Sequence, residues 1–442
     1  MALTRRAFLD RASRLGAGLF AAPLVLNLSG CGEDSTDVTP DAAPSGSGGS
    51  QGHDGHDASD PHDASLIADA QMPNVNANAI AAGAVLLGLY EGDAEAAARA
   101  AIEKLDFSWL REGDSVLIKV ASNSGHVHPA VTSPAGVKGV VAHLKELGAG
   151  RVIVADQAGV EWVRRSAAGR FSSTRERFTE NGLIMLEEHA ELHFFDDNGF
   201  EEGYFEATLP EGHHWPRGMY LPNVIKDIDH IIYMPRLSQH ILAGITLAQK
   251  SAIGFIRDDS RHDLHNDAVD FYEKYTEINY TEELKSRTRL VISINEKLHL
   301  HGGPDVATVY EMSPTLVLAS TSLANHDALG ASLLVTLGAM VPASSGGMTY
   351  NGTFAALFNS AFAGGTGVGT GDAGPWVSES TSSSYVAHAF ADGITKDRAV
   401  QRGWSLSGGQ PESIAIVQDG AALEDNVREG VETHGEGLYA FA

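Results

Sequence analysis

The chain has almost no cysteine and is short of positive charge, and both shortages exclude whole classes of protein. Its 442 residues include one cysteine, Cys31, so no intrachain disulfide, iron–sulfur cluster or cysteine-built zinc site can form. Any metal site must therefore use histidine, carboxylate or backbone oxygen. The 31 lysines and arginines face 57 aspartates and glutamates, a formal net charge of -26. Nucleic acid is therefore not an expected partner, and we do not expect the folded body to dock on anionic lipids.

The first thirty residues resemble a bacterial export address. Residues 4–9, TRRAFL, match the twin-arginine export pattern, which implies the twin-arginine machinery as a partner and export in the folded state. The apolar stretch 15–26 is too short to span a bilayer as a helix. Residues 28–31, LSGC, resemble a lipobox in which Cys31 is lipidated. We therefore expect a signal peptide over 1–30 and a lipid anchor in the cell envelope, periplasmic or on the outer surface. An ordinary cleaved signal with an incidental cysteine is the alternative.

A polar stretch follows over residues 31–76. It is rich in Gly, Ser, Asp and His and has few apolar residues, so it cannot bury a core and is predicted to be a disordered linker. His53, His56 and His62 stand beside aspartates. A His/Asp tract can scavenge divalent metal, although a solvated acidic tether explains the same residues.

Residues 77–420 alternate between apolar strands and amphipathic helices, which predicts an α/β fold with a largely parallel, Rossmann-like sheet flanked by helices. This domain comprises one or two subdomains, and 421–442 read as a C-terminal tail. Short apolar runs predict strands at 115–120, 151–155, 230–234, 290–294, 315–319 and 413–417. Apolar spacing predicts helices at 94–106, 134–147 and 326–337.

Polar residues gather where the predicted strands end, and ligands of open parallel sheets bind at that edge. Each residue on its own is also an ordinary loop residue. The group comprises Asn123, His126, His128, Asp156, Asn295, Glu296, His299 and His301.

The segment HILAGITLAQK, residues 240–250, has His240 and Lys250 at the ends of an otherwise apolar run. On one continuous helix the two would lie roughly 80° apart around the axis. A loop through Ala243–Thr246 would instead let both side chains converge on one pocket, where a buried lysine can act as nucleophile or base. A lysine at a helix end and a capping histidine are the simpler explanation.

Several segments together resemble the bacterial and archaeal family called domain of unknown function 362, over roughly residues 114–420. They are SVLIKV, TSPAGVKGVVAHLKELGAGRVIVADQAG, MPRLSQHILAGITLAQKSAIGFIRDDSRHDLH, HGGP, ASTSLANHDALGA and RAVQRGWSLSGGQPESIAIV. The family pattern of His, Gly-x-Thr, Lys, Gly, Arg and His falls on His240, Gly244, Thr246, Lys250, Gly254, Arg261 and His265.

Two departures from the family limit what carries over. Many relatives contain cysteine-rich ferredoxin modules, which this chain lacks. The usual Lys-Pro-Asn after the first strand is replaced by residues 119–123, KVASN, so Lys119 is retained without the proline.

A remoter similarity links the chain to nickel-pincer lactate racemases. There a histidine precedes a lysine by ten residues, the lysine holds the pyridinium-derived cofactor and a second histidine follows. His240, Lys250 and His265 stand in a similar order, and Asp156 ends a strand where a further ligand is expected.

These observations support two hypotheses. In the first, the chain is a metal- or metal-cofactor-dependent enzyme acting on a small organic acid. His240 and His265 would bind nickel, zinc or iron, Lys250 would be the covalent anchor or base, and Asp156 and Asp327 would be supporting carboxylates. Thr246, Lys119 and Arg261 would complete the cofactor site. In the second, the chain is a tethered, non-catalytic receptor that holds a small anionic ligand through Lys119, Lys250 and Arg261.

Overall fold

The computed structural model describes residues 74–160, 162–166, 169–240, 243–266, 270–301, 303–305, 307–341 and 393–442, with the backbone alone at Ser166, His265 and Asn266. Met72–Ala442 form one unit, and Met1–Gln71 form another in which no residue is described. The signal peptide, Cys31 and the linker through residue 73 therefore lie outside the described residues. Within the described ranges, no helix is long and apolar enough to cross a membrane.

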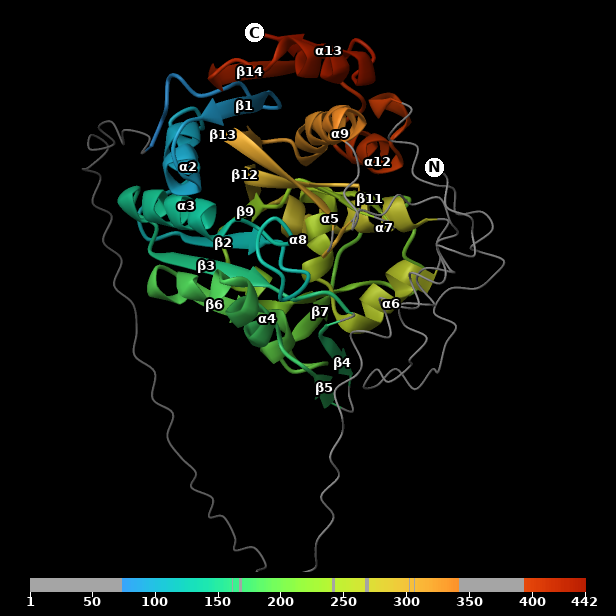
Figure 1. Cartoon of the computed structure of the whole chain (residues 1–442). Coiled ribbons are helices and arrows are strands. Elements are labelled where there is room, and N and C mark those ends of the chain that lie inside the picture. Colours follow the sequence, from blue (N-terminus) through green and yellow to red (C-terminus); the bar gives the residue numbers. More distant parts are fainter. Residues whose placement is uncertain are drawn as a thin grey trace, which may run out of the picture. The chain divides into compact units, whose positions relative to one another are not determined.

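The unit is built around one mixed sheet (Figure 1). Its described strands follow the spatial order β15 (Tyr439–Phe441), β14 (Ile414–Gly420), β1 (Val85–Tyr90), β13 (Thr308–Ser320), β12 (Thr288–Leu300), β9 (His230–Met234), β2 (Ser115–Val120), β3 (Arg151–Asp156) and β6 (Glu191–Phe194). β13 is antiparallel to both of its neighbours, and the other neighbours on this path pair in parallel. The predicted α/β fold with a largely parallel sheet is confirmed.

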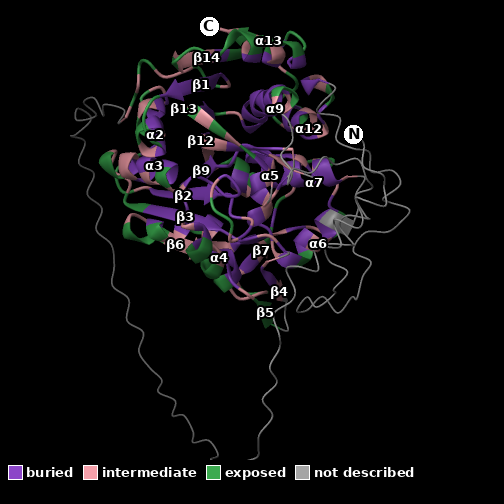
Figure 2. Cartoon of the chain, viewed as in Figure 1, coloured by how far each residue is buried: buried purple, intermediate pink, exposed green. Residues whose placement is uncertain are grey.

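Helices cover both faces of the sheet, which explains why strands such as β1, β2 and β9 are buried at every position (Figure 2). α2 (Ala94–Ile102) and α3 (Pro134–Glu146) contribute to one apolar core. α9 (Leu323–Met340), α12 (Arg398–Leu406) and α13 (Asp425–His434) contribute to another. α3 shows why the helices were predictable, because Ser133 caps it, Pro134 opens it and Gly148 follows it in a left-handed conformation.

The structure departs from the sequence prediction in three places. β1 was not predicted, because Gly88 interrupts its short apolar run. β12 and β13 are each 13 residues long, far longer than the runs at 290–294 and 315–319, because their outer halves pair as a partly polar hairpin. Residues 421–442, which read as a tail, form α13 and β15, and β15 pairs with β14.

The outer half of β12 positions the candidate site. β12 runs parallel to β9 but continues past its carboxyl end, and there it pairs with β10 (Ser238–His240). β10 forms a hairpin with β11 (Gly244–Thr246), and α5 (Ala248–Ser251) follows. The segment 240–250 is therefore a strand end, a hairpin and a short helix rather than one continuous helix.

Candidate functional site

Lys119 and Asp156 meet at the carboxyl ends of β2 and β3. The Lys119 Nζ lies 2.6 Å from Asp156 Oδ1, and both side chains are buried. Burial lowers the pKa of Lys119, and the Asp156 carboxylate opposes that effect. The Lys119 ammonium also donates to the carbonyl oxygens of Val120 and Ser251, each at 2.8 Å. The ammonium therefore has two carbonyl acceptors and one ion-pair partner, all from the protein.

Arg261 is also bound by protein groups. It is buried in α6 (Asp258–Asn266) and donates to the carbonyl oxygens of Ile256, Ala158, Gln157 and Gly254. Two of these carbonyls belong to the loop directly after β3, so Arg261 fixes this loop against α6. Lys119 and Arg261 thus both bind backbone carbonyls around the end of β3, and their predicted role toward a cofactor stays a prediction.

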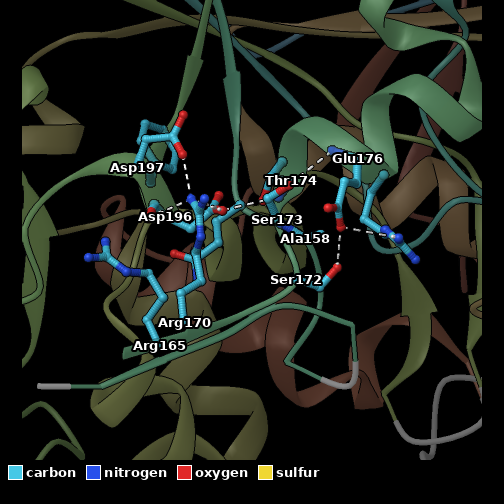
Figure 3. Close-up of polar contacts among 12 residues, drawn as sticks. Ala158, Arg165, Arg170, Ser172, Ser173, Thr174, Glu176, Asp196 and Asp197 are labelled. Atoms are coloured by element: carbon cyan, nitrogen blue, oxygen red, sulfur yellow. Dashed lines mark hydrogen bonds and ion pairs between the residues drawn. The ribbon is translucent and has the colours of Figure 1, made fainter. Parts of the chain in front are cut away.

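The same loop after β3 is held from its other side (Figure 3). The Ala158 amide donates to Thr174 Oγ1 at 3.0 Å, and the Thr174 amide donates to Asp196 Oδ2 at 3.1 Å. Arg170 of the β4–β5 hairpin (Arg164–Ser166 and Gly169–Phe171) binds Asp196 and Asp197. Arg170 is thus held by two aspartates, and Asp196 links the hairpin to Thr174.

Strand register places Thr246, Ser238 and His299 in one row. Ser238 pairs with Thr246 on β11 and with His299 on β12, and directly paired residues point to the same face. His240 lies two residues beyond Ser238 and shares that face. Burial agrees, because the alternating residues Leu237, Ile245, Leu247, Leu298 and Leu300 belong to the apolar core that includes α9.

Two polar atoms in this row are buried without a hydrogen bond from the described part of the chain. They are Thr246 Oγ1 and His299 Nδ1, in side chains that are 5% and 3% exposed. Buried polar groups are almost always hydrogen-bonded, because an unpaired one costs about 1–3 kcal/mol. Two such atoms on one face are therefore candidates for contact with a ligand.

His128 lies near His299 and pairs with Glu296. His128 Nε2 is 3.4 Å from Glu296 Oε2, and neither atom makes a hydrogen bond within the described ranges. His128 Nδ1 contacts the Val131 carbonyl at 3.0 Å, and Ser133 donates to the other Glu296 oxygen at 2.8 Å. These second contacts orient both side chains, and the Glu296 side chain remains 29% exposed.

Burial keeps the two histidines of this cluster uncharged. The pKa of His299 is lowered from 6.5 to about 3, first because the ring is buried and second because Arg236 and His128 are near. Burial also lowers the pKa of His128, although Glu296 opposes the shift. Both imidazoles are therefore neutral at pH 7. Arg236 is buried among them and donates to the carbonyl oxygens of Pro129 and Pro304.

The predicted metal ligands are only partly described. His240 ends β10, and its Nδ1 accepts a hydrogen bond from the Ala243 amide at 3.2 Å. The side chain of His265 lies outside the description. Among the described residues, no group of three or more His, Cys, Asp or Glu could hold a metal ion. The residues described thus do not fit a preformed metal site, and the metal assignment stays a prediction.

Lys250 and Asp327 have different relations to α5, since Lys250 belongs to the helix and Asp327 binds its amino end. Lys250 is a half-buried residue of α5. Asp327 is buried on α9 and accepts hydrogen bonds from the Ala248 and Gln249 amides, both at 2.9 Å. Asp327 is thus a helix cap, and the sequence offered no signal for that role.

A surface hollow of about 570 Å³ lies elsewhere, lined by Thr208, Leu209, Pro210, Glu211, Tyr280, Glu282, Lys285, Arg402, Ser405 and Leu406. None of these residues belongs to the cluster described above. We place the candidate site at the carboxyl-end cluster because unpaired buried polar atoms gather there, whereas Lys285 and Arg402 of the hollow bind Leu406 and Glu277.

Fold and site together define an α/β protein with a polar cluster at the carboxyl ends of its parallel strands. The family model described as "Domain of unknown function (DUF362)" matches residues 116–332. This match confirms the family resemblance for that part of the chain.

Solved structures show remote similarity, among them the following one. It is the lactate racemase apoprotein from Thermoanaerobacterium thermosaccharolyticum, with 12% sequence identity and a TM-score of 0.34, over 53% of this chain and 54% of that chain. The chain thus spans about half the length of that protein. This is the remote similarity noted from the sequence, and at this TM-score it carries nothing about the reaction. No curated protein matches the chain.

Proposed function

We propose that the protein is an enzyme that binds a small organic acid at the carboxyl-end cluster and moves a proton on it. The observation that carries the proposal is the pair of His128 Nε2 and Glu296 Oε2, 3.4 Å apart, with His299 near His128. These two atoms and His299 Nδ1 are buried and make no hydrogen bond in the described part of the chain. The neutral imidazoles would accept the proton, Glu296 would share it with His128, and the Arg236 charge would attract the substrate carboxylate.

The test combines binding with isotope exchange. The full chain would be screened by calorimetry and thermal shift against 2-hydroxy, 2-oxo and dicarboxylic acids. Each binder would then be incubated in D2O and followed by NMR for deuterium entering a C–H position. We expect wild type to bind and exchange, and His299→Gln and Glu296→Gln to lose exchange by at least a hundredfold. Lys297→Gln, at a half-buried neighbour on β12 that pairs with Glu311, is the matched control.

The other outcomes separate the alternatives. Binding without exchange that survives both substitutions would support the tethered receptor instead. If no acid at millimolar concentration shifts the melting temperature of wild type, the organic-acid proposal is wrong.

We also propose that the protein is exported by the twin-arginine route and anchored through a lipid on Cys31. The support is the sequence pattern alone, since these residues lie outside the described part. Replacing Arg5 and Arg6 by lysine should keep the precursor in the cytoplasm. Cys31→Ser should release the exported protein from the membrane fraction and abolish palmitate labelling.

Metal dependence needs its own measurement. Elemental analysis would use the exported protein with its histidine-rich linker deleted, because that linker could hold metal by itself. One nickel, zinc or iron per chain that disappears in His240→Ala would support the metal hypothesis. Absence of metal from wild type, purified from well-supplied cells, would contradict it.

A further inference from the structure

α5 is a four-residue helix with a buried charge at each end. At its amino end, the two oxygens of Asp327 accept hydrogen bonds from the Ala248 and Gln249 amides. At its carboxyl end, Lys119 donates to the Ser251 carbonyl. A carboxylate at the amino end and an ammonium at the carboxyl end are both favourable for the helix dipole.

The carboxylate is held by a second pair of buried groups. His326 Nδ1 lies 3.0 Å from Asp327 Oδ1, and His326 Nε2 lies 2.9 Å from the Ser293 hydroxyl. This order of serine, histidine and aspartate matches that of a hydrolase triad. Ser293 and His326 are fully buried, however, so no substrate reaches the hydroxyl in this structure. The arrangement can therefore orient Asp327 but cannot attack a substrate there.

The Lys119 ammonium is also fixed by buried groups. Asp156 contacts Lys119 through Oδ1 and accepts the Ser122 amide through Oδ2 at 2.6 Å. Gly254 lies directly over this pair, and a Cβ there would lie 1.9 Å from Asp156 Oδ1. Each end of α5 is thus bound to a charge that is itself fixed by at least one further buried group.

We infer that Asp327 and Lys119 form an electrostatic clamp that positions α5, with Ser293 and His326 as positioning residues. So short a helix has little stability of its own. The clamp sets the place of Thr246, two residues before α5, and of Lys250 within it. The inference rests on the proposed function for its purpose, because Thr246 belongs to the candidate site.

The experiment measures amide hydrogen exchange of the full chain by mass spectrometry, with no ligand. In Asp327→Asn, we expect the amides of Ala248 and Gln249 to exchange at least tenfold faster than in wild type. Leu329→Ala is the matched control, since it lies on the same helix α9 and is fully buried in the core. It should lower the melting temperature without this local effect.

A second pair of variants tests the positioning role and remains informative if Asp327→Asn fails to fold. His326→Leu removes the donor to Asp327 and should raise local exchange, whereas His326→Asn supplies an N–H near the Nδ1 position and should restore protection. Equal exchange in Leu329→Ala and Asp327→Asn, or in His326→Leu and His326→Asn, would overturn the inference. Because no ligand is involved, either result leaves the organic-acid screen to stand or fail separately.

Discussion

At the scale of single residues, the protein places its ionisable groups in two kinds of environment. Lys119, Asp156 and Arg261 are buried and fully engaged with protein partners. His299 and His128 are buried with one ring nitrogen that makes no hydrogen bond in the described ranges. Groups of the first kind stabilise the fold. Groups of the second kind have a ring nitrogen to which a ligand could form a hydrogen bond.

The lowered pKa of His299 makes stability depend on pH. His299 binds a proton near pH 6.5 in the unfolded chain, but only near pH 3 in the folded chain. Stability should therefore fall as the pH drops from 6.5 towards 3, by on the order of a few kcal/mol. His299→Gln should flatten this part of a melting-temperature profile, whereas Lys297→Gln should leave its slope unchanged. An equal slope in wild type and His299→Gln would contradict the assignment.

Breaking the Lys119–Asp156 pair should be costly, because a buried charge loses its partner. Asp156→Asn is expected to lower the free energy of unfolding by about 3–5 kcal/mol. Urea denaturation measures this loss. Arg151→Gln is the control at the exposed start of the same strand, where an exposed pair with Glu191 should contribute at most about 1 kcal/mol.

At the scale of elements, Gly254 allows the segment that follows α5 to lie close to the end of β3. Gly254→Ala should destabilise the protein by about 1–3 kcal/mol, because the new methyl group meets the Asp156 carboxylate. The double variant Gly254→Ala/Asp156→Ala should show a clear coupling energy, since the smaller side chain makes room. Additive losses in denaturation experiments would show that the two positions do not compete for the same space.

The elements that the sequence predicts well are those with local signals. α3 has its cap and proline at its start and its glycine just past its end, and β2 and β3 are largely apolar runs, interrupted in β2 by Lys119. The outer half of β12 has no such signal, because its polar residues face a site made by β10 and β11. The row of Thr246, Ser238 and His299 depends on register between segments far apart in sequence, which no local pattern reports.

The sequence pointed to residues of the candidate site but not to how they lie together. Strand ends directed attention to His128, Glu296 and His299, but each looked like an ordinary loop residue until the sheet brought them together. Lys119 and Arg261 matched a family pattern, and only their hydrogen bonds show that they are occupied by the protein itself.

At the scale of the whole molecule, the family match does not coincide with the sheet. Residues 116–332 include β9, β12 and β13 but leave out β1, β14 and β15. A fragment of 116–332 would expose β13 along the edge that β1 covers. We expect that fragment to aggregate or remain unfolded, and 72–442 to melt cooperatively, as measured by circular dichroism and gel filtration. A monomeric, cooperatively folded 116–332 would contradict this expectation.

The pairing of β1 with β14 also has a consequence for folding during protein synthesis. β1 is among the first strands to leave the exit tunnel, yet its parallel partner is made close to the end of translation. Throughout most of synthesis, the apolar segment VLLGLY therefore has no β14 strand to pair with along one edge. We therefore expect this edge of β1 to stay unpaired in the nascent chain until Ile414–Gly420, close to the end of the message, have been translated.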